Sequence, residues 1–195
     1  MKNFNLRSIG LATALGLGSI ALIGCTTTTN DSQATPAVSR ASMETSVDET
    51  LSRLYSTVPG TREMVSNAAG VLVFPAVVGG SFVVGAEHGR GALRVGGQTV
   101  AYYSTTGASI GFQAGGQSRS VIYVFNTQEA LQKFRASNGW TAGADATVAV
   151  GTVGANGRVD TKTLQQPITS FTLTNVGLEA GVSVSGGRIT PISLP

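Results

Sequence analysis

The stretch Val121-Ile122-Tyr123-Val124-Phe125 decides the fold, because five consecutive apolar residues stand there between a serine and an asparagine. A short apolar run rich in β-branched and aromatic residues predicts a central strand that is buried on both faces. Outward from it, apolar and polar residues alternate in segments that predict strands with one buried face. These segments are residues 109–114, 171–174 and 178–185, and further strands are expected at 71–74, 81–85, 92–95, 99–103, 147–150 and 188–192.

Glycine is unusually frequent, with 26 copies in 195 residues. Gly85, Gly111 and Gly181 fall inside predicted strands, where glycine indicates a sharp bend, a bulge or a close backbone approach. Glycine pairs such as Gly96-Gly97 are expected to form turns. The sequence therefore predicts an α+β fold, in which a strongly curved, Gly-rich, mainly antiparallel sheet or small barrel packs with about three helices.

The first predicted helix begins near Ala41 and ends before Pro59-Gly60. Its apolar stripe has helical spacing and consists of Met43, Val47, Leu51 and Leu54. A helix lying on a membrane surface usually has a polar face rich in Lys and Arg, whereas this one is acidic, so packing against the core is expected instead.

Two shorter helices are predicted further along the chain. One covers residues 62–69 and stops at Gly70 as a C-cap. The other begins after Thr127, a plausible N-cap, and presents Ala130, Leu131 and Phe134 on its apolar side.

The N-terminal 24 residues have the three parts of an export signal: Lys2 and Arg7, an apolar run over 9–23, and a small-residue cleavage region. The sequence Leu22-Ile23-Gly24-Cys25 resembles the lipobox of bacterial lipoproteins. That resemblance implies cleavage before Cys25, acylation (palmitate among the chains) on this cysteine and, with Thr26 following, delivery to the outer membrane facing the periplasm. The alternative is an ordinary signal peptide with a coincidental cysteine.

Residues 25–40 continue as a Thr-rich, polar segment that is expected to be a flexible tether. The domain organisation is thus a signal peptide at 1–24, a lipidated Cys25 with its tether to 40, and one domain at 41–195. Without the signal peptide, 11 basic and 10 acidic residues remain. This near-neutral balance argues against a nucleic-acid binder.

Catalytic and metal chemistry find little support in the sequence. The single His88 and single Cys25 cannot assemble a Cys/His zinc site. Glu87 precedes His88 directly, so on a strand the two side chains point to opposite faces and cannot act together. A Gly-x-Ser-x-Gly pattern occurs at Gly107-Ala108-Ser109-Ile110-Gly111, but it leads into a predicted strand and does not form a strand-to-helix turn, and no phosphate-binding glycine motif occurs. We therefore expect no enzyme, no metal and no cofactor.

Five segments, in order, resemble the successive motifs of the SYLF domain. They are GVLVFPAVVGGSFVVGAEHGRGAL (70–93), ASIGFQAGGQS (108–118), VIYVFNTQEALQKF (121–134), GWTAGADATVAVG (139–151) and PITSFTLTNVGLEAGVSVSGGRI (167–189). The resemblance runs from about Ala41 to the C-terminus. It implies lipid binding, since eukaryotic members bind phosphoinositides and other anionic lipids, and some bind actin. Bacterial relatives are mostly exported lipoproteins.

One departure from the family bears on specificity. Eukaryotic members use a basic amphipathic N-terminal helix for lipid binding, whereas residues 41–58 here carry Glu44, Asp48 and Glu49 against Arg53. Phosphoinositide specificity is therefore not expected, and actin is not an expected partner of a bacterial envelope protein.

The candidate lipid-binding residues are His88, Arg90, Arg94 and Trp140. An extended chain places the first three on one face and Glu87 on the other. The alternative is two solvated arginines beside a turn. Trp140 either caps the core or lies at a membrane interface, where tryptophan is favoured.

The sequence as a whole predicts a non-catalytic envelope lipoprotein whose SYLF-like domain binds anionic lipids or membrane surfaces. The rival interpretation is a structural or interaction protein that binds another envelope protein and touches lipid only through its acyl anchor.

Overall fold

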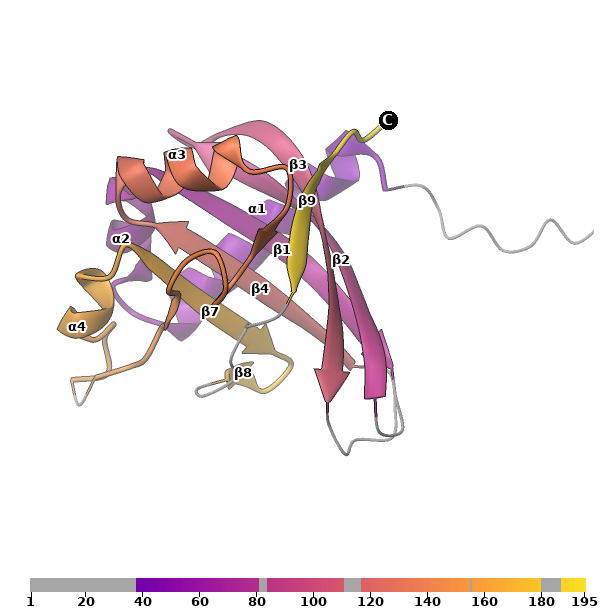
Figure 1. The fold of residues 1–195 in the computed structure, drawn as a ribbon. Coiled ribbons are helices and arrows are strands. Elements are labelled where there is room, and N and C mark those ends of the chain that lie inside the picture. The colour runs from indigo at the N-terminus through magenta and orange to yellow at the C-terminus, as the bar shows by residue number, and fades with distance from the viewer. Residues whose placement is uncertain (1–37, 81–83, 111–116, 155, 180–186) are drawn as a thin grey trace, which may run out of the picture. The chain divides into compact units, whose positions relative to one another are not determined.

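The computed structural model describes residues 38–80, 84–110, 117–154, 156–179 and 187–195 (Figure 1). The predicted signal peptide, Cys25, nearly all of the predicted tether and the glycines Gly111 and Gly181 lie outside these residues, as do most of the strands expected at 109–114 and 178–185. Residues Pro36–Pro195 form one compact unit.

Four helices and nine strands make up the described part of the chain. The helices are α1 (Arg40–Thr57), α2 (Thr61–Asn67), α3 (Gln128–Ala136) and α4 (Thr161–Leu164). The strands are β1 (Gly70–Gly80), β2 (Val84–Val95), β3 (Gln98–Ile110), β4 (Gln117–Phe125), β5 (Trp140–Thr141), β6 (Ala149–Val150), β7 (Ile168–Thr174), β8 (Gly177–Leu178) and β9 (Arg188–Ile192).

All described strands belong to one strongly curled sheet, with the order β5-β9-β3-β2-β1-β4-β7-β6 and β8 paired to β7 (Figure 1). Every pairing is antiparallel except that of β6 with β7. The predicted α+β fold with a curved, mainly antiparallel sheet is confirmed. The order of the described strands is open, running from β5 to β6, so the curled sheet is found rather than the small barrel. The three expected helices are α1, α2 and α3, and α4 adds a single turn.

The sheet carries a hydrophobic core on each face. Successive residues of β4 alternate between the cores: Ile122 and Val124 pack with α1, whereas Tyr123 and Phe125 pack with α3. Figure 1 shows these two helices on opposite faces of the sheet. The prediction that 121–125 is a central strand packed on both sides is confirmed, and so is the burial of the α1 stripe.

A β-bulge interrupts the central strand β1 at Pro75. The register shifts there against both neighbours, between Val73 and Ala76 toward β2 and between Phe74 and Val77 toward β4. Proline has no N–H to donate to a ladder, so a central strand accommodates it at a bulge. The Pro75 carbonyl accepts a hydrogen bond from the Ser120 hydroxyl at 2.7 Å.

Residues 81–83 of the strand predicted at 81–85 lie outside the described residues. Val84 and Gly85 belong to the same strand, β2, as the segment 92–95 that was predicted as a separate strand, and β2 continues through the glycine-rich residues between them. The ladder with β3 runs without a break past Gly85, so this glycine marks no bulge. Gly91 has a packing role instead, because a Cβ there would collide with the Val73 carbonyl and the Phe74 ring beside the Pro75 bulge.

Of the two helix ends predicted from local sequence, one is confirmed and one is wrong. Thr127 caps α3 by accepting a hydrogen bond from the Ala130 amide at 3.2 Å, as predicted. Helix α2 ends at Asn67, and Gly70 begins β1 rather than capping the helix, so that prediction was wrong. The Gly96-Gly97 pair forms the two-residue turn between β2 and β3 with φ of 59° and 80°, since a tight hairpin favours positive φ.

The start of α1 is fastened to the C-terminal segment. The Arg40 amide donates to the Pro195 carbonyl at 3.3 Å, and Arg40 Nε donates to the Leu194 carbonyl at 3.0 Å. Leu194 is itself buried in the α1 core. The chain therefore enters and leaves the described domain at neighbouring points.

Candidate functional site

One face of the sheet carries exposed basic side chains from the two strands β2 and β9. His88 on β2 pairs with Thr106 on β3, and Thr106 pairs with Arg188 on β9. Directly paired residues share a face, so these three form one row across the sheet. Arg90 lies in the next row, opposite Ser104. We name His88, Arg90, Thr106 and Arg188 the cationic row; all four are exposed.

The cationic row faces the same side of the sheet as α1. Ala92, two residues beyond Arg90 on β2, is fully buried in the α1 core. Glu87, by contrast, points to the other face, where its carboxylate pairs with Arg119 at 2.6 Å. The alternation predicted for this segment is therefore what the structure shows.

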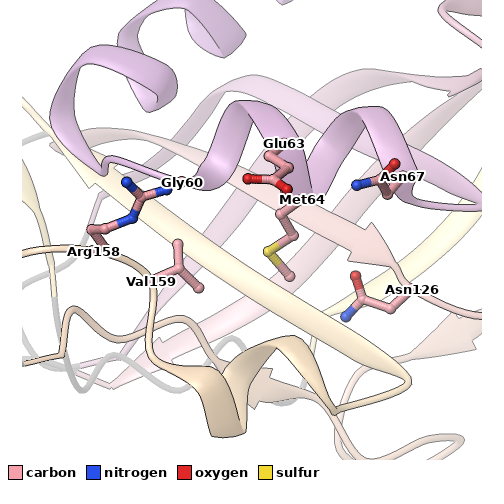
Figure 2. A pocket seen from close by; sticks show the side chains of 7 residues that line it. All are labelled: Gly60, Glu63, Met64, Asn67, Asn126, Arg158 and Val159. Atoms are coloured by element: carbon pink, nitrogen blue, oxygen red, sulfur yellow. The ribbon is translucent and has the colours of Figure 1, made fainter.

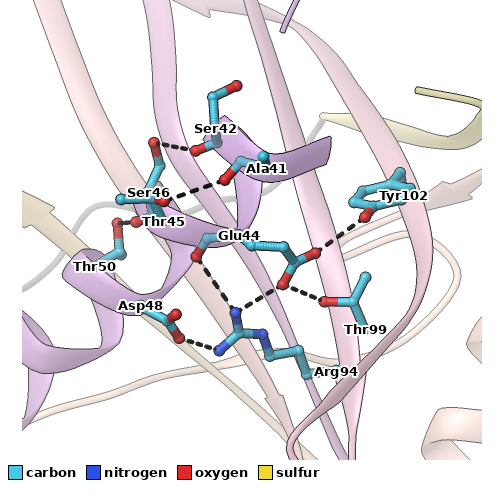
Figure 3. A network of polar contacts seen from close by, with 10 residues as sticks. All are labelled: Ala41, Ser42, Glu44, Thr45, Ser46, Asp48, Thr50, Arg94, Thr99 and Tyr102. Carbon is cyan, nitrogen blue, oxygen red and sulfur yellow. Dashed lines mark hydrogen bonds and ion pairs between the residues drawn. The ribbon is translucent and has the colours of Figure 1, made fainter. Parts of the chain in front are cut away.

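Arg94 lies on the same face but is engaged in the contact with α1 (Figure 3). Its guanidinium donates to Asp48 at 2.5 Å and to Glu44 at 2.9 Å, and its side chain is 12% exposed. Glu44 accepts further hydrogen bonds from Thr99 at 2.8 Å and Tyr102 at 3.0 Å. Arg94 therefore fastens α1 to the β2–β3 hairpin, and we leave it out of the cationic row.

The Glu44 carboxylate is the centre of this network. Partial burial disfavours its charged form, but the hydrogen bonds from Thr99, Arg94 and Tyr102 outweigh burial and hold the pKa of Glu44 below its usual range. The pKa of Arg94 is raised, because its contacts with Asp48 and Glu44 outweigh the effect of burial.

Trp140 belongs to the core under α3. It is 3% exposed, and its ring makes edge-on contacts with Tyr123 at 5.7 Å and Phe134 at 5.4 Å between centroids. Of the two roles considered for this residue, the structure shows the core one. The ring is not presented at the surface.

Arg188 and Thr106 are the members of the cationic row that sequence reasoning missed. Alternation along β3 and β9 indicates which residues of one strand share a face, but it does not say which strands are neighbours. Only the register of β2, β3 and β9 brings these side chains beside His88.

A cavity of about 320 Å³ lies between α2, the end of β4 and the 158–159 segment (Figure 2). It is lined by Gly60, Glu63, Met64, Asn67, Asn126, Arg158 and Val159. The Asn126 amide is already used, because its Nδ2 donates to the Gln166 carbonyl at 2.6 Å and to Thr169 Oγ1 at 3.2 Å. The other polar side chains that line the cavity, those of Glu63, Asn67 and Arg158, belong to exposed residues. We therefore assign this cavity no role.

Two further properties concern only the part of the chain that the structure describes. No group of three or more His, Cys, Asp or Glu side chains there could hold a metal ion. No helix in those ranges is both long and apolar enough to cross a membrane.

The curled, mainly antiparallel sheet with helices on both faces defines a small α+β domain, and one of its faces carries the cationic row. Residues 106–193 match the family model Ysc84, described as Las17-binding protein actin regulator. The match confirms the resemblance to the SYLF domain over these residues. It includes Thr106 and Arg188 but begins after His88 and Arg90. No curated protein matches the chain.

Proposed function

We propose that the protein is a non-catalytic lipoprotein of a bacterial cell envelope whose domain binds anionic lipid headgroups through the cationic row. The observation that carries the proposal is the alignment of His88, Thr106 and Arg188 across three neighbouring strands, with Arg90 in the adjoining row. Strands lie about 4.8 Å apart, so His88 and Arg188 are separated by roughly 10 Å across the sheet. Such spacing suits neighbouring headgroups in a flat membrane surface.

The charges of the row are available to a ligand. Among the described residues, neither Arg90 nor Arg188 forms an ion pair, whereas Arg94 and Arg119 do. The neighbouring Thr106 adds a hydroxyl donor, and Val78, which pairs with His88, is an apolar side chain that is 54% exposed. Basic residues near an anionic surface contribute about 1 kcal/mol each.

The anchor part of the proposal rests on the sequence. Acylation of Cys25 holds the protein on the membrane, because each buried methylene contributes about 0.8 kcal/mol. The roughly 14 residues between Cys25 and the start of α1 can extend about 45–50 Å. That reach allows the domain to bind the membrane that holds its own anchor. We propose the outer membrane, facing the periplasm, as the location.

Vesicle binding tests the proposal without the anchor. Pro36–Pro195 carries both hydrophobic cores and is one compact unit, so a chain that begins at Pro36 suffices. We expect it to bind vesicles containing phosphatidylglycerol and not pure phosphatidylcholine. Replacing both Arg90→Gln and Arg188→Gln should weaken this binding roughly 30-fold, since about 2 kcal/mol is lost.

A matched control removes two exposed arginines elsewhere, Arg135→Gln and Arg158→Gln, and changes the net charge equally. It should leave most of the affinity intact. Equal losses in the two double variants would contradict a localised site and indicate that only net charge matters.

A protein partner is the second candidate function, favoured by the match to a family described as Las17-binding. In that case the chain from Pro36 should bind no vesicle of any composition, and the membrane contact of the protein would depend wholly on Cys25.

A further inference from the structure

A second cavity, of about 510 Å³, lies between α1, α2 and the turn that joins β2 to β3. It is lined by Leu51, Tyr55, Arg62, Val65, Ser66, Ala68, Gly70, Val71, Arg94, Gly96 and Gly97. Small-molecule sites in proteins have this size, with mainly apolar walls and a few polar groups.

The cavity has both polar and apolar walls, and the apolar part comes from α1, α2 and β1. Leu51 and Val71 are buried members of the α1 core, and Tyr55, Val65 and Ala68 pack against that core while remaining partly exposed. The mouth is left open at the hairpin turn, because a Cβ placed on Gly96 or Gly97 would meet nothing within 4 Å. The cavity can therefore accept an apolar body from the solvent side.

The two guanidinium groups at the cavity differ in availability. Arg94 already binds Asp48 and Glu44. Arg62 lies over the Tyr55 ring, with its Cζ 4.4 Å from the ring centroid. Among the described residues no carboxylate pairs with Arg62, which is exposed. Stacking on the ring holds the guanidinium in place and leaves its N–H groups free to donate.

The Tyr55 hydroxyl is the second polar group. Burial raises the pKa of Tyr55, although the nearby charges of Arg62 and Arg94 oppose the shift. The hydroxyl is therefore protonated at neutral pH and can donate a hydrogen bond. A cation and a hydroxyl donor beside an apolar wall match a ligand with one anionic end and an apolar body.

We propose that this cavity binds a small amphipathic anion, with its carboxylate or phosphate on Arg62 and Tyr55 and its alkyl body against Leu51, Val65 and Val71. The site is separate from the cationic row, since Arg94 and Arg90 are four residues, about 13 Å, apart along β2. It binds one molecule in a cavity, whereas the cationic row binds a membrane surface. The inference does not depend on the function proposed above.

Calorimetric titration of the Pro36–Pro195 chain tests the inference with four probes of one chain length. Decanoate and decyl phosphate present the two anionic headgroups, and decanol and decylammonium are the neutral and cationic controls. We expect Kd values on the order of 10–100 µM for at least one anion. The controls should bind at least tenfold more weakly. Equal affinity for decanol would overturn the anion site.

Variants locate the binding. Arg62→Gln should lower anion affinity about tenfold or more, because a charge-assisted hydrogen bond is lost. Tyr55→Phe keeps the ring that stacks on Arg62 and removes only the hydroxyl, so a smaller loss is expected. The double variant Arg90→Gln/Arg188→Gln should weaken vesicle binding and leave anion affinity unchanged. Arg62→Gln should weaken anion binding and leave vesicle binding unchanged.

Amide NMR spectra give a readout that does not depend on the variants. Saturating decanoate or decyl phosphate should shift the amide signals of Gly70, Gly96 and Gly97 at the cavity. Shifts confined to His88, Arg90 and Thr106 would place the anion on the cationic row and overturn the cavity site, without touching the proposal for membrane binding.

Discussion

Glu44 shows how much a single side chain can organise when its partners come from distant segments. Arg94, Thr99 and Tyr102 all donate to it, and they lie 50, 55 and 58 residues further along the chain. The sequence places Glu44 on the polar side of a helix, where an acidic residue ordinarily faces water. No local pattern indicates the three donors, because sheet register and helix packing bring them together.

The first prediction at this scale concerns acid stability. The pKa of Glu44 is lower in the folded than in the unfolded chain. Its contribution is therefore complete above the unfolded pKa, about 4.3, and is lost as pH falls through the folded pKa. Glu44→Gln should cost about 1 kcal/mol at pH 7 and flatten the loss of stability below pH 5.

Denaturant unfolding measured between pH 3 and pH 7 checks this expectation. The matched control is Glu49→Gln, which removes an exposed acid of the same helix that forms no ion pair among the described residues. If both variants keep the same acid dependence as the parent chain, the network around Glu44 does not stabilise the fold.

A second residue-scale prediction uses the only tryptophan. Because Trp140 is buried against Tyr123 and Phe134, its fluorescence maximum should be blue-shifted without any lipid. The maximum should not move when anionic vesicles are added, even when sedimentation proves binding. A further blue shift on binding would show that the ring leaves the core for the membrane.

At the scale of elements, what could be predicted depended on whether the signal was local. The helical spacing of the apolar residues in α1, the N-cap of α3 and the burial of β4 on both faces each depend on residues close together in the sequence. All three predictions are confirmed. The bulge at Pro75 and the continuity of β2 depend on neighbouring strands. Gly85, expected to mark a bend or bulge, lies in an unbroken ladder, whereas Gly91 lies against the bulged strand β1 and leaves room for it.

Gly91 provides the element-scale prediction. A methyl group there would collide with the Val73 carbonyl, which is backbone and cannot rotate away. Gly91→Ala should therefore destabilise the domain by about 1–3 kcal/mol, the usual cost of overpacking. Thermal unfolding provides the measurement.

Gly96→Asn is the control, because the turn position is open and asparagine tolerates positive φ. It should cost much less than the Gly91 change. A Gly91→Ala variant as stable as the parent would mean that the two strands separate without loss.

The whole molecule combines a sheet with two cores and, as proposed, a lipid anchor. The fold class followed from the sequence because alternation, glycine content and helical period agreed on it. Only part of the cationic row could be predicted from the sequence. His88 and Arg90 were expected, whereas Arg188 joins them through pairing across three strands and Arg94 is taken up by α1.

The prediction for the whole molecule concerns the anchor. Protein extracted from membranes should begin at Cys25 and carry acyl chains, because the lipobox-like sequence precedes this residue. Intact-mass analysis measures both properties at once. Cys25→Ser should leave an uncleaved, unacylated precursor, and an unmodified mature chain with another N-terminus would contradict the proposal.

The fastening of Arg40 to Leu194 and Pro195 also has a mechanical consequence. If Cys25 is anchored as proposed and the domain binds a partner, tension between anchor and partner enters the domain at Arg40. The load falls first on the two hydrogen bonds of Arg40, the first residue of α1, and on the buried Leu194, before it reaches the rest of α1. The contacts of Leu194 and Pro195 with Arg40 should thus protect α1 from mechanical unfolding. Removing them should lower the force at which α1 separates from the sheet.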